Sequence, residues 1–312
     1  MAKVVFGIDI GGTTVKCGLL DPEGNMLEKS EIPTRKENGG SLILDDIYAH
    51  IQEICKARGI TKEDVLGIGM GVPGAVREDG VVNKCVNLGW GVFNVAEEMQ
   101  KKTGFPVKAG NDANVAALGE FWVGGAKGYS SMMMITVGTG VGGGIIVDGK
   151  PVVGFNGAAA EIGHIPVMDD ETEACNCGKK GCLEQYASAT GIVRVARRML
   201  NQEDTPSTLR NVDDLTARVV FDEAKSGDTM AIKVTEYVSK VLGKGLACAA
   251  GIVDPECFLI GGGVSAAGDF FTDKIEKYYR EQVFHPSKNT RILKAALGND
   301  AGMYGAAKLV LG

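Results

Sequence analysis

Short apolar runs alternate with amphipathic stretches along the chain, and this alternation predicts an α/β protein. Three strand-like runs come first, at 3–11, 14–21 and 26–34, and short turns join them. The segment 41–59 follows, and its apolar residues recur at helical spacing, which predicts a helix with one buried face. These residues are Ile43, Ile47, Ile51 and Ile54.

The rest of the chain repeats this alternation. Further strands are predicted at 65–74, 106–110, 257–265 and 291–297, and helices at 95–102, 113–122, 190–200, 213–226, 228–252, 270–283 and 301–311. The segments 4–21 and 131–150 both have the order strand, turn with a Gly-Thr pair, strand. This similarity indicates a weak internal duplication and favours mixed sheets with packed helices in two related halves.

Composition and charge narrow the class of protein. The 312 residues are 45% hydrophobic and 23% charged, as in folded globular proteins. A net charge of -6 and a pI near 5.3 argue against a nucleic-acid partner. The apolar runs are too short for a membrane span, and the first residues do not form a signal peptide. We therefore expect a cytoplasmic protein without a membrane partner, in which clustered cysteines are metal ligands more often than disulfides.

The stretch "DIGGTTVK" lies in the first predicted turn. Glycine lets backbone N–H groups approach phosphate oxygens, while threonine hydroxyls donate hydrogen bonds and lysine adds positive charge. A plain hairpin turn explains the two glycines equally well. The aspartate favours phosphate binding, because a carboxylate beside phosphate requires a divalent cation such as Mg²⁺ between them. The candidates are Asp9, Gly11, Gly12, Thr13, Thr14 and Lys16.

Two more glycine turns follow predicted strands. Gly138, Thr139 and Gly140 begin a formal G-x-G-x-x-G, but the motif runs into a strand instead of opening a helix, which argues against a dinucleotide fold. The third turn, Gly261, Gly262 and Gly263, is either an adenosine contact or only a strand end. Three such turns in two related halves indicate a nucleotide held between two domains.

One histidine and three cysteines form the pattern His-x10-Cys-x-Cys-x4-Cys, at His164, Cys175, Cys177 and Cys182. Three thiolates and one imidazole are the ligands of a closed structural zinc site. Unrelated buried thiols are the alternative, which suits Cys55, Cys248 and Cys257 better because they lie on apolar segments.

A histidine bound to zinc cannot act as a base through the bound nitrogen. We therefore assign base chemistry to a carboxylate. Glu161 and Glu184 flank the cluster, and we expect them to face a polyhydroxylated ligand together with an imidazole edge.

The motifs "DIGGTTVK", "GNDANVAALGE", "GTGVGGGIIVDGK", "AAAEIGH" and "CNCGKKGCLEQYASATG" together resemble the ROK family (repressors, uncharacterised open reading frames, kinases), and within it the glucokinase-like members. This resemblance implies two ribonuclease-H-like domains of the actin-like ATPase and sugar-kinase class, which clasp ATP in an interdomain cleft. It places the small domain at 1–111 with 299–312, and the large domain, with its zinc loop, at 112–298. It also implies a homodimer or homotetramer.

The resemblance implies transfer of the γ-phosphate of ATP to the 6-hydroxyl of glucose, with Asp112 as the general base. Helix N-capping is the alternative role for Asp112. The residues implied to bind sugar are Gly74, Asn87, Asn111, Asp112, Glu161, His164 and Glu184. The chain departs from the family pattern at Ala160, where many members have glycine.

Three alternatives stand beside this prediction. A kinase of the same family acting on mannose, N-acetylglucosamine, N-acetylmannosamine, fructose or allose would share the mechanism. A switching ATPase without a sugar substrate is disfavoured by the carboxylates around the zinc loop. A repressor would need a DNA-binding domain before the first phosphate motif, which already begins at Asp9.

Overall fold

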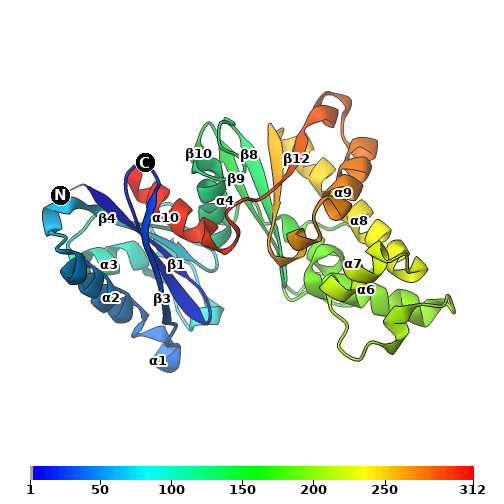
Figure 1. The fold of residues 1–312 in the computed structure, drawn as a ribbon, viewed down its shortest axis with the longest axis horizontal. Coiled ribbons are helices and arrows are strands. Elements are labelled where there is room, and N and C mark those ends of the chain that lie inside the picture. The colour runs from blue at the N-terminus through cyan, green and yellow to red at the C-terminus, as the bar shows by residue number, and fades with distance from the viewer. Residues whose placement is uncertain (1–2) are drawn as a thin grey trace. The chain divides into compact units, whose positions relative to one another are not determined.

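The computed structural model describes residues 3–312 and contains two mixed five-stranded sheets with helices packed on them (Figure 1). The strands are β1 (Val4–Ile10), β2 (Thr14–Leu20), β3 (Met26–Pro33), β4 (Val65–Val72), β5 (Val81–Val82), β6 (Phe93–Asn94), β7 (Val107–Asn111), β8 (Met132–Val137), β9 (Val141–Val147), β10 (Lys150–Pro151), β11 (Cys257–Gly261) and β12 (Arg291–Lys294). The helices are α1 (Glu37–Gly40), α2 (Ile43–Arg58), α3 (Val95–Thr103), α4 (Asp112–Trp122), α5 (Glu184–Ala187), α6 (Ala189–Gln202), α7 (Ala217–Lys225), α8 (Thr229–Val253), α9 (Asp269–Gln282) and α10 (Ala301–Leu311).

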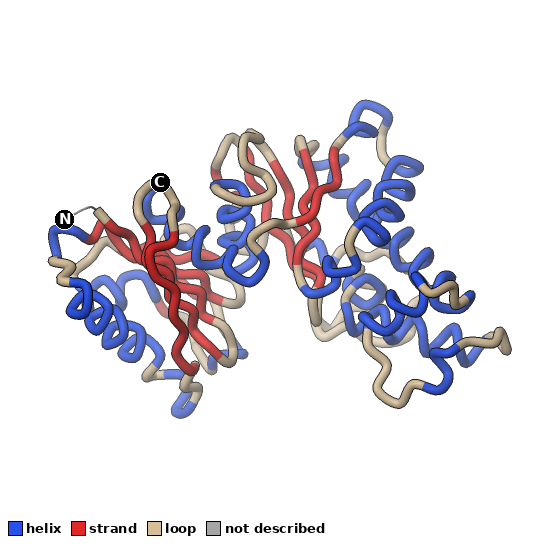
Figure 2. Tube along the Cα trace, in the orientation of Figure 1, coloured by secondary structure: helices blue, strands red, loops and turns tan. Residues whose placement is uncertain are grey.

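The two large sheets have the same strand order. The first runs β3-β2-β1-β4-β7, with β2 antiparallel to both neighbours and with β4 parallel to both of its neighbours. The second runs β10-β9-β8-β11-β12, with β11 parallel to β8 and to β12. Figure 2 shows the strands in red and the helices in blue. In each sheet the order is third, second, first, fourth and fifth along the chain. The expected α/β class is confirmed, and the shared order agrees with the duplication inferred from the two Gly-Thr turns.

Contacts divide the chain into two compact units. The first consists of the residues up to Ser130 together with Gly144–Ala160 and Ala296–Gly312, and the second consists of Ser131–Gly143 and Glu161–Ala295. Helix α4 thus belongs to the first unit. The domain boundaries implied by the family resemblance, 1–111 with 299–312 and 112–298, stay a prediction.

Successive residues of β1 point to opposite faces of the first sheet. Phe6 and Ile8 lie in a core cluster with Ile47 of α2, while Val5 packs with Ala307 of α10. Both faces of β1 are therefore covered, which is why its sequence is a continuous apolar run and not an alternating one. The predicted buried face of α2 is confirmed, since its four isoleucines are all buried.

Two glycine-lined contacts let α10 lie unusually close to its neighbours. A methyl group at Gly305 would stand 1.6 Å from the carbonyl oxygen of Val115 in α4. A methyl group at Gly69 of β4 would stand 1.6 Å from the carbonyl oxygen of Ala306. Backbone therefore approaches backbone on both sides of α10, and no larger residue fits at either glycine.

The carboxylate of Glu120 joins α4 to the segment that leads into α10. Glu120 is fully buried, and it accepts hydrogen bonds from the backbone N–H of Gly125 at 2.8 Å, Ala296 at 3.0 Å and Leu297 at 2.7 Å. Three N–H donors satisfy a carboxylate that burial would otherwise make costly.

Most predicted elements are present, with two informative differences. The helix predicted at 213–226 begins only at Ala217, because the Thr216 side chain caps it by accepting a hydrogen bond from Val219 N. The four-residue helix α5 was not predicted, since it is too short to show helical periodicity. The glycine turn at 138–140 leads into strand β9, as expected, so it does not have the context of a dinucleotide-binding motif.

No helix within residues 3–312 combines the length and the apolar character that a membrane crossing requires.

The close approach of α10 to α4 makes a specific prediction. Gly305→Ala should lower the free energy of unfolding by about 3 kcal/mol or more, because backbone atoms cannot yield to the added methyl group. Differential scanning calorimetry of the purified protein measures the effect as a lower Tm.

Gly251→Ala in α8 is the matched control, because a methyl group there meets no atom within 4 Å. Alanine is the better helix former, so this variant should be as stable as the parent or up to about 1 kcal/mol more stable. Equal Tm values for the two variants would contradict the packing described for α10.

Candidate functional site

The four predicted metal ligands come together in the second unit. Their ligand atoms all lie within 4.8 Å of one another: His164, Cys175, Cys177 and Cys182. Cys177 Sγ lies 3.6 Å from Cys182 Sγ, and Cys175 Sγ lies 4.0 Å from His164 Nδ1. The eight cysteines of the chain are all free thiols, so no disulfide competes for these sulfurs.

Local turns explain how this loop brings its cysteines together. Gly178 and Gly181 both have positive φ, 86° and 74°, as expected for the tight turns that return Cys182 to the cluster. Cys175 N donates to Lys179 O at 2.7 Å, and Gly178 N donates to Cys175 O at 2.8 Å, which closes the first of these turns.

The cluster fits a tetrahedral zinc ion. Zinc–sulfur bonds of ~2.3 Å at tetrahedral angles place sulfurs ~3.8 Å apart, close to the Cys177–Cys182 separation. Burial raises the pKa of Cys175 to about 12, whereas the backbone N–H of Lys179 lowers the pKa of Cys177. Zinc binds the thiolate, so a zinc ion bound here would displace the proton of Cys175.

The two flanking carboxylates lie against opposite nitrogens of the His164 ring. Glu184 Oε1 is 3.7 Å from Nδ1, on the side of the cysteines, and Glu161 Oε2 is 4.0 Å from Nε2. Since Nδ1 faces the sulfurs, Nε2 is the nitrogen left for a ligand. Glu161 is half-exposed, and Glu184 is mostly covered. The two carboxylates expected to bind a polyhydroxylated ligand thus lie beside one imidazole ring, Glu184 on its sulfur side and Glu161 on the other.

Glu184 also lies against the glycine turn between β8 and β9. Val141 N points to Glu184 Oε2 at 3.5 Å, and a methyl group at Gly140 would stand 2.8 Å from the same oxygen. A larger residue at 140 would therefore push this carboxylate out of its position. The turn predicted to bind phosphate and a residue predicted to bind sugar thus touch within one unit.

A cavity of about 600 Å³ in the second unit brings two of the predicted nucleotide turns together. Gly138 and Thr139 line one part of it, and Gly263 lines another. Phe221 and Ala217 of α7 add apolar surface, while Lys225 adds positive charge. An apolar wall with backbone donors and a cation suits a purine nucleotide. Gly261 and Gly262 do not line this cavity; a methyl group at Gly262 would meet Val137 O at 2.5 Å, so this glycine serves packing.

In the first unit, the turn between β1 and β2 holds the remaining phosphate candidates. Gly11 N donates to Thr14 O at 2.9 Å, which closes a tight turn over Gly12 and Thr13. Burial raises the pKa of Asp9, and the charge of Lys16 opposes this effect. Lys16 Nζ donates to Asn299 O at 2.8 Å.

The first turn of α10 lies directly against the Asp9 carboxylate. A methyl group at Gly302 would stand 2.7 Å from Asp9 Oδ2. The positive end of the α10 dipole therefore faces a half-buried carboxylate. A magnesium ion at this point would remove the cost of burying the charge, so Asp9 suits the cation predicted from the sequence.

The expected base, Asp112, follows β7 as the first residue of α4. The N-cap is not Asp112 but Asn111, whose Oδ1 accepts from Ala113 N at 3.0 Å and from Asn114 N at 3.1 Å. Asn111 Nδ2 donates to Gly74 O at 2.9 Å and to Asp112 Oδ1 at 3.0 Å. Asn111 is therefore the N-cap, Asp112 Oδ1 adds a hydrogen bond from Ala113 N at 2.9 Å, and Asn111 holds the Asp112 carboxylate in place.

The other first-unit candidates lie in nearby turns. Gly74 has a φ of 95°, which favours glycine, and its carbonyl is used by Asn111 as described above. Asn87 is exposed within a short 3₁₀ turn, Val86–Leu88. Ala160 has a φ of 65°, a left-handed conformation that costs an alanine ~1–2 kcal/mol. This strain gives a physical reason for the glycine that many family members have there.

The sequence pattern of the ROK family matches residues 5–312. The chain belongs to the ROK family. It is 40% identical to a glucokinase of Halalkalibacterium halodurans over 309 residues, which is 97% of this chain and 94% of that protein.

Solved structures of the family have the same fold. A ROK family glucokinase from Streptomyces griseus, in complex with glucose and AMPPNP, matches with a TM-score of 0.77 and 34% identity over 98% of both chains. A ROK family transcriptional regulator, a homologue of the E. coli MLC protein, matches with a TM-score of 0.87 and 26% identity over 100% of this chain and 78% of that one. The two mixed sheets are thus those of the actin-like, two-domain sugar kinases of this family.

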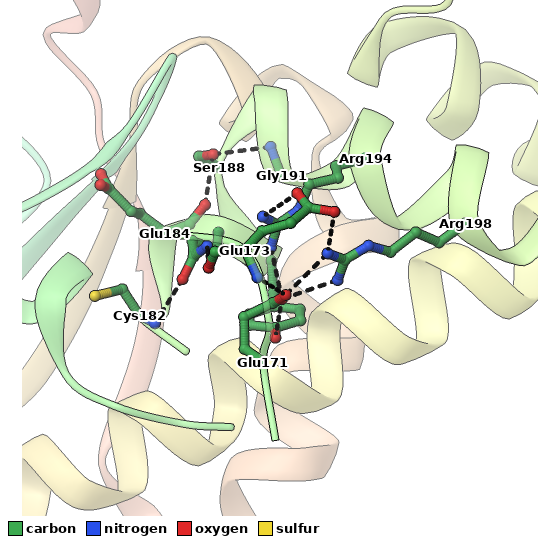
Figure 3. Close-up of polar contacts among 10 residues, drawn as sticks. Glu171, Glu173, Cys182, Glu184, Ser188, Gly191, Arg194 and Arg198 are labelled. Atoms are coloured by element: carbon green, nitrogen blue, oxygen red, sulfur yellow. Dashed lines mark hydrogen bonds and ion pairs between the residues drawn. The ribbon is translucent and has the colours of Figure 1, made fainter. Parts of the chain in front are cut away.

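Sequence reasoning missed an ionic cluster beside the metal ligands. Glu171 and Glu173 of the cysteine-containing loop bind Arg194 and Arg198 of α6 (Figure 3). Hydrogen bonds from Arg198 and Tyr186 hold the pKa of Glu171 well below its usual range. The signal available in the sequence was the spacing of the two arginines, which places them on one face of a helix.

The cluster geometry predicts the effect of removing one sulfur. Cys177→Ser should reduce bound zinc to well below one ion per chain, because serine is a poor ligand for zinc beside two thiolates. Metal analysis of the purified protein measures this loss directly. Cys248→Ser is the control, since Cys248 lies outside the cluster and is exposed, contrary to the buried position expected from its apolar segment. A Cys177→Ser protein that retained a full complement of zinc would show that the cluster is not the metal site.

Proposed function

We propose that the protein is an ATP-dependent glucokinase, which transfers the γ-phosphate of ATP to the 6-hydroxyl of glucose. The observation that carries the proposal is the placement of Glu161 and Glu184 on the two sides of the His164 ring, beside the cysteine cluster. The relatives support it, since glucose and an ATP analogue are bound in the Streptomyces griseus glucokinase that this chain resembles.

In this proposal, hydroxyl recognition belongs to the carboxylates and the imidazole. A carboxylate accepts two or more hydrogen bonds from sugar hydroxyls, and His164 Nε2 can donate or accept one. Asn111, Gly74 and Asn87 complete the set of proposed sugar-binding residues. Such polar groups discriminate strongly, because an unmade hydrogen bond leaves a desolvated partner without compensation.

Asp112 is the proposed general base. It accepts the proton of the 6-hydroxyl as the oxygen of that hydroxyl attacks the γ-phosphorus, while the bond from phosphorus to the bridging oxygen breaks and ADP leaves. Phosphoryl transfer depends chiefly on positioning and on charge neutralisation, so a carboxylate held by Asn111 is sufficient.

The proposed ATP contacts are the three glycine turns. The turn at 138–140 and Gly263 border the 600 Å³ cavity, which we assign to the nucleoside. The turn at 11–14, with Lys16, is assigned to the phosphates. Magnesium, held by Asp9, would neutralise phosphate charge, and zinc, held by His164 and the three cysteines, would be structural, since four protein ligands leave no position for water.

Another hexose is the alternative substrate. Mannose, N-acetylglucosamine, N-acetylmannosamine, fructose and allose differ from glucose in the groups that the same side chains would bind. A cytoplasmic location and a homodimeric or homotetrameric assembly stay predictions.

A sugar panel tests the proposal. With ATP and Mg²⁺, glucose should give the highest kcat/KM among the six sugars, with ADP release measured against a control without sugar. Preference for another sugar would replace glucose but keep the mechanism. ADP release that does not depend on any sugar would contradict the proposal and favour a switching ATPase.

Removal of the proposed base gives a separate prediction. Asp112→Asn should lower kcat about a hundredfold or more, because the amide cannot accept the proton, while glucose binding should stay within about threefold. Steady-state kinetics and calorimetric titration with glucose measure the two quantities. Asp273→Asn, at an exposed position of α9, is the control. Loss of glucose binding in Asp112→Asn would make this residue a sugar ligand and not the base.

A further inference from the structure

The Glu171 carboxylate lies at the centre of the ionic cluster described above. Its side chain is 2% exposed. Arg198 donates to both oxygens, at 2.8 and 2.9 Å, and Arg194 donates at 3.1 Å (Figure 3). The Tyr186 hydroxyl donates at 2.5 Å, and the backbone N–H of Glu173 at 3.0 Å. A buried carboxylate with five donors is a rigid point of the structure.

The donors come from three different elements. Arg194 and Arg198 are one turn apart on α6, Tyr186 lies on α5, and Glu173 lies on the loop that contains Cys175 and Cys177. The carboxylate of Glu173 adds a second negative charge, which binds Arg198 at 2.6 Å. Two arginines and two glutamates balance in charge, so the loop, α5 and α6 are joined without a net buried charge.

Gln185 makes a second connection between the same parts. It is buried, its Oε1 accepts from Cys182 N at 3.0 Å, and its Nε2 donates to Glu173 O at 3.1 Å. The Gln185 side chain thus links Cys182, the last metal ligand, to Glu173, which precedes the first cysteine of the loop. Because Gln185 directly follows Glu184, this connection also fixes the start of α5.

Helix α5 cannot hold Glu184 by itself. It has four residues, and a helix of that length has too few internal hydrogen bonds to be stable alone. The position of Glu184 therefore depends on tertiary contacts, which are its own contacts with Val141 and Cys175 and those of the residues beside it. The two residues that follow it, Gln185 and Tyr186, both bind the loop through Glu173 and Glu171.

We propose that Glu171 is a positioning residue, which holds Glu184 at the sugar through Tyr186 and the two arginines of α6, independently of the metal ion. This inference rests on the proposed sugar-kinase function. The metal ligands reach Glu184 from another side, where Cys175 Sγ is 2.9 Å from Glu184 Oε1. Glu184 therefore has two supports made of different residues, a metal cluster and an ionic cluster.

The test is Glu171→Gln in the zinc-containing protein, with glucose and ATP as substrates. Glutamine keeps the shape but removes the charge that binds two arginines. The KM for glucose should rise about tenfold, because supporting residues of a site typically contribute this much. The kcat should change less than about threefold, since Glu184 binds ground state and transition state alike. Zinc content should stay the same as in the parent.

Two further variants make the test specific. Glu203→Gln removes a glutamate that pairs with Lys233 at 2.6 Å on the exposed surface of the same unit, so its KM should equal that of the parent. Tyr186→Phe removes only the hydroxyl that donates to Glu171, and it should raise the KM for glucose about threefold, consistent with the loss of one hydrogen bond. If Glu171→Gln does not fold, the KM for glucose of this milder variant tests the positioning role.

The outcomes distinguish failure of the positioning role from failure of the proposed function. A Glu171→Gln protein with lower kcat and lower Tm but an unchanged KM would show a purely structural role. Loss of zinc together with the rise in KM would show that the cluster acts through the metal. Either result overturns the positioning role while the parent enzyme remains a glucokinase. A parent protein without sugar-dependent ADP release would instead overturn the proposed function, and the positioning role with it.

Discussion

The imidazole of His164 has two nitrogens, and the sulfur cluster faces one of them. This constraint organises the second unit around the site. Because Nδ1 points to the cysteines, Nε2 points away from them, towards Glu161. The loop has to bring three sulfurs to one side of the ring, which requires the positive φ of Gly178 and Gly181 and the burial of Cys175 and Cys182. A structural metal site of this kind orients a ligand-binding surface without taking part in chemistry.

Both the side chain and the backbone of Glu184 are held by their surroundings. Its carboxylate lies against Gly140, where a larger residue would displace it, and its backbone begins a helix too short to be stable alone. The first unit shows the same principle at Asp112, where Asn111 uses its whole amide group to cap α4 and to hold the adjacent carboxylate. In both places, the residue next to the proposed functional one does the positioning. Substitutions beside the functional residues are therefore expected to be nearly as harmful as substitutions of those residues.

Much of the fold and of the candidate site could be predicted from the sequence, because strong local patterns indicate them. The isoleucines of α2, the glycine turns after strands and the spacing of His164 with three cysteines each identify a structure without reference to the rest of the chain. The ionic cluster of Glu171 could not be predicted, since it depends on how a loop folds back on α6. The same holds for the left-handed backbone of Ala160, which only the surrounding structure enforces.

The order of the segments has a consequence for synthesis on the ribosome. The first unit is completed by α10, whose glycine-lined contacts with α4 and β4 join residues far apart in the sequence. The Glu120 carboxylate likewise receives two of its hydrogen bonds only after Ala296 and Leu297 have been synthesised. The second unit lies between these segments. Its residues 161–295 therefore emerge before the first unit can close, so the second unit can fold while the first is still an open sheet with an uncovered apolar face. A chain that stalls before residue 296 would expose that face, and chaperones would be expected to bind it there.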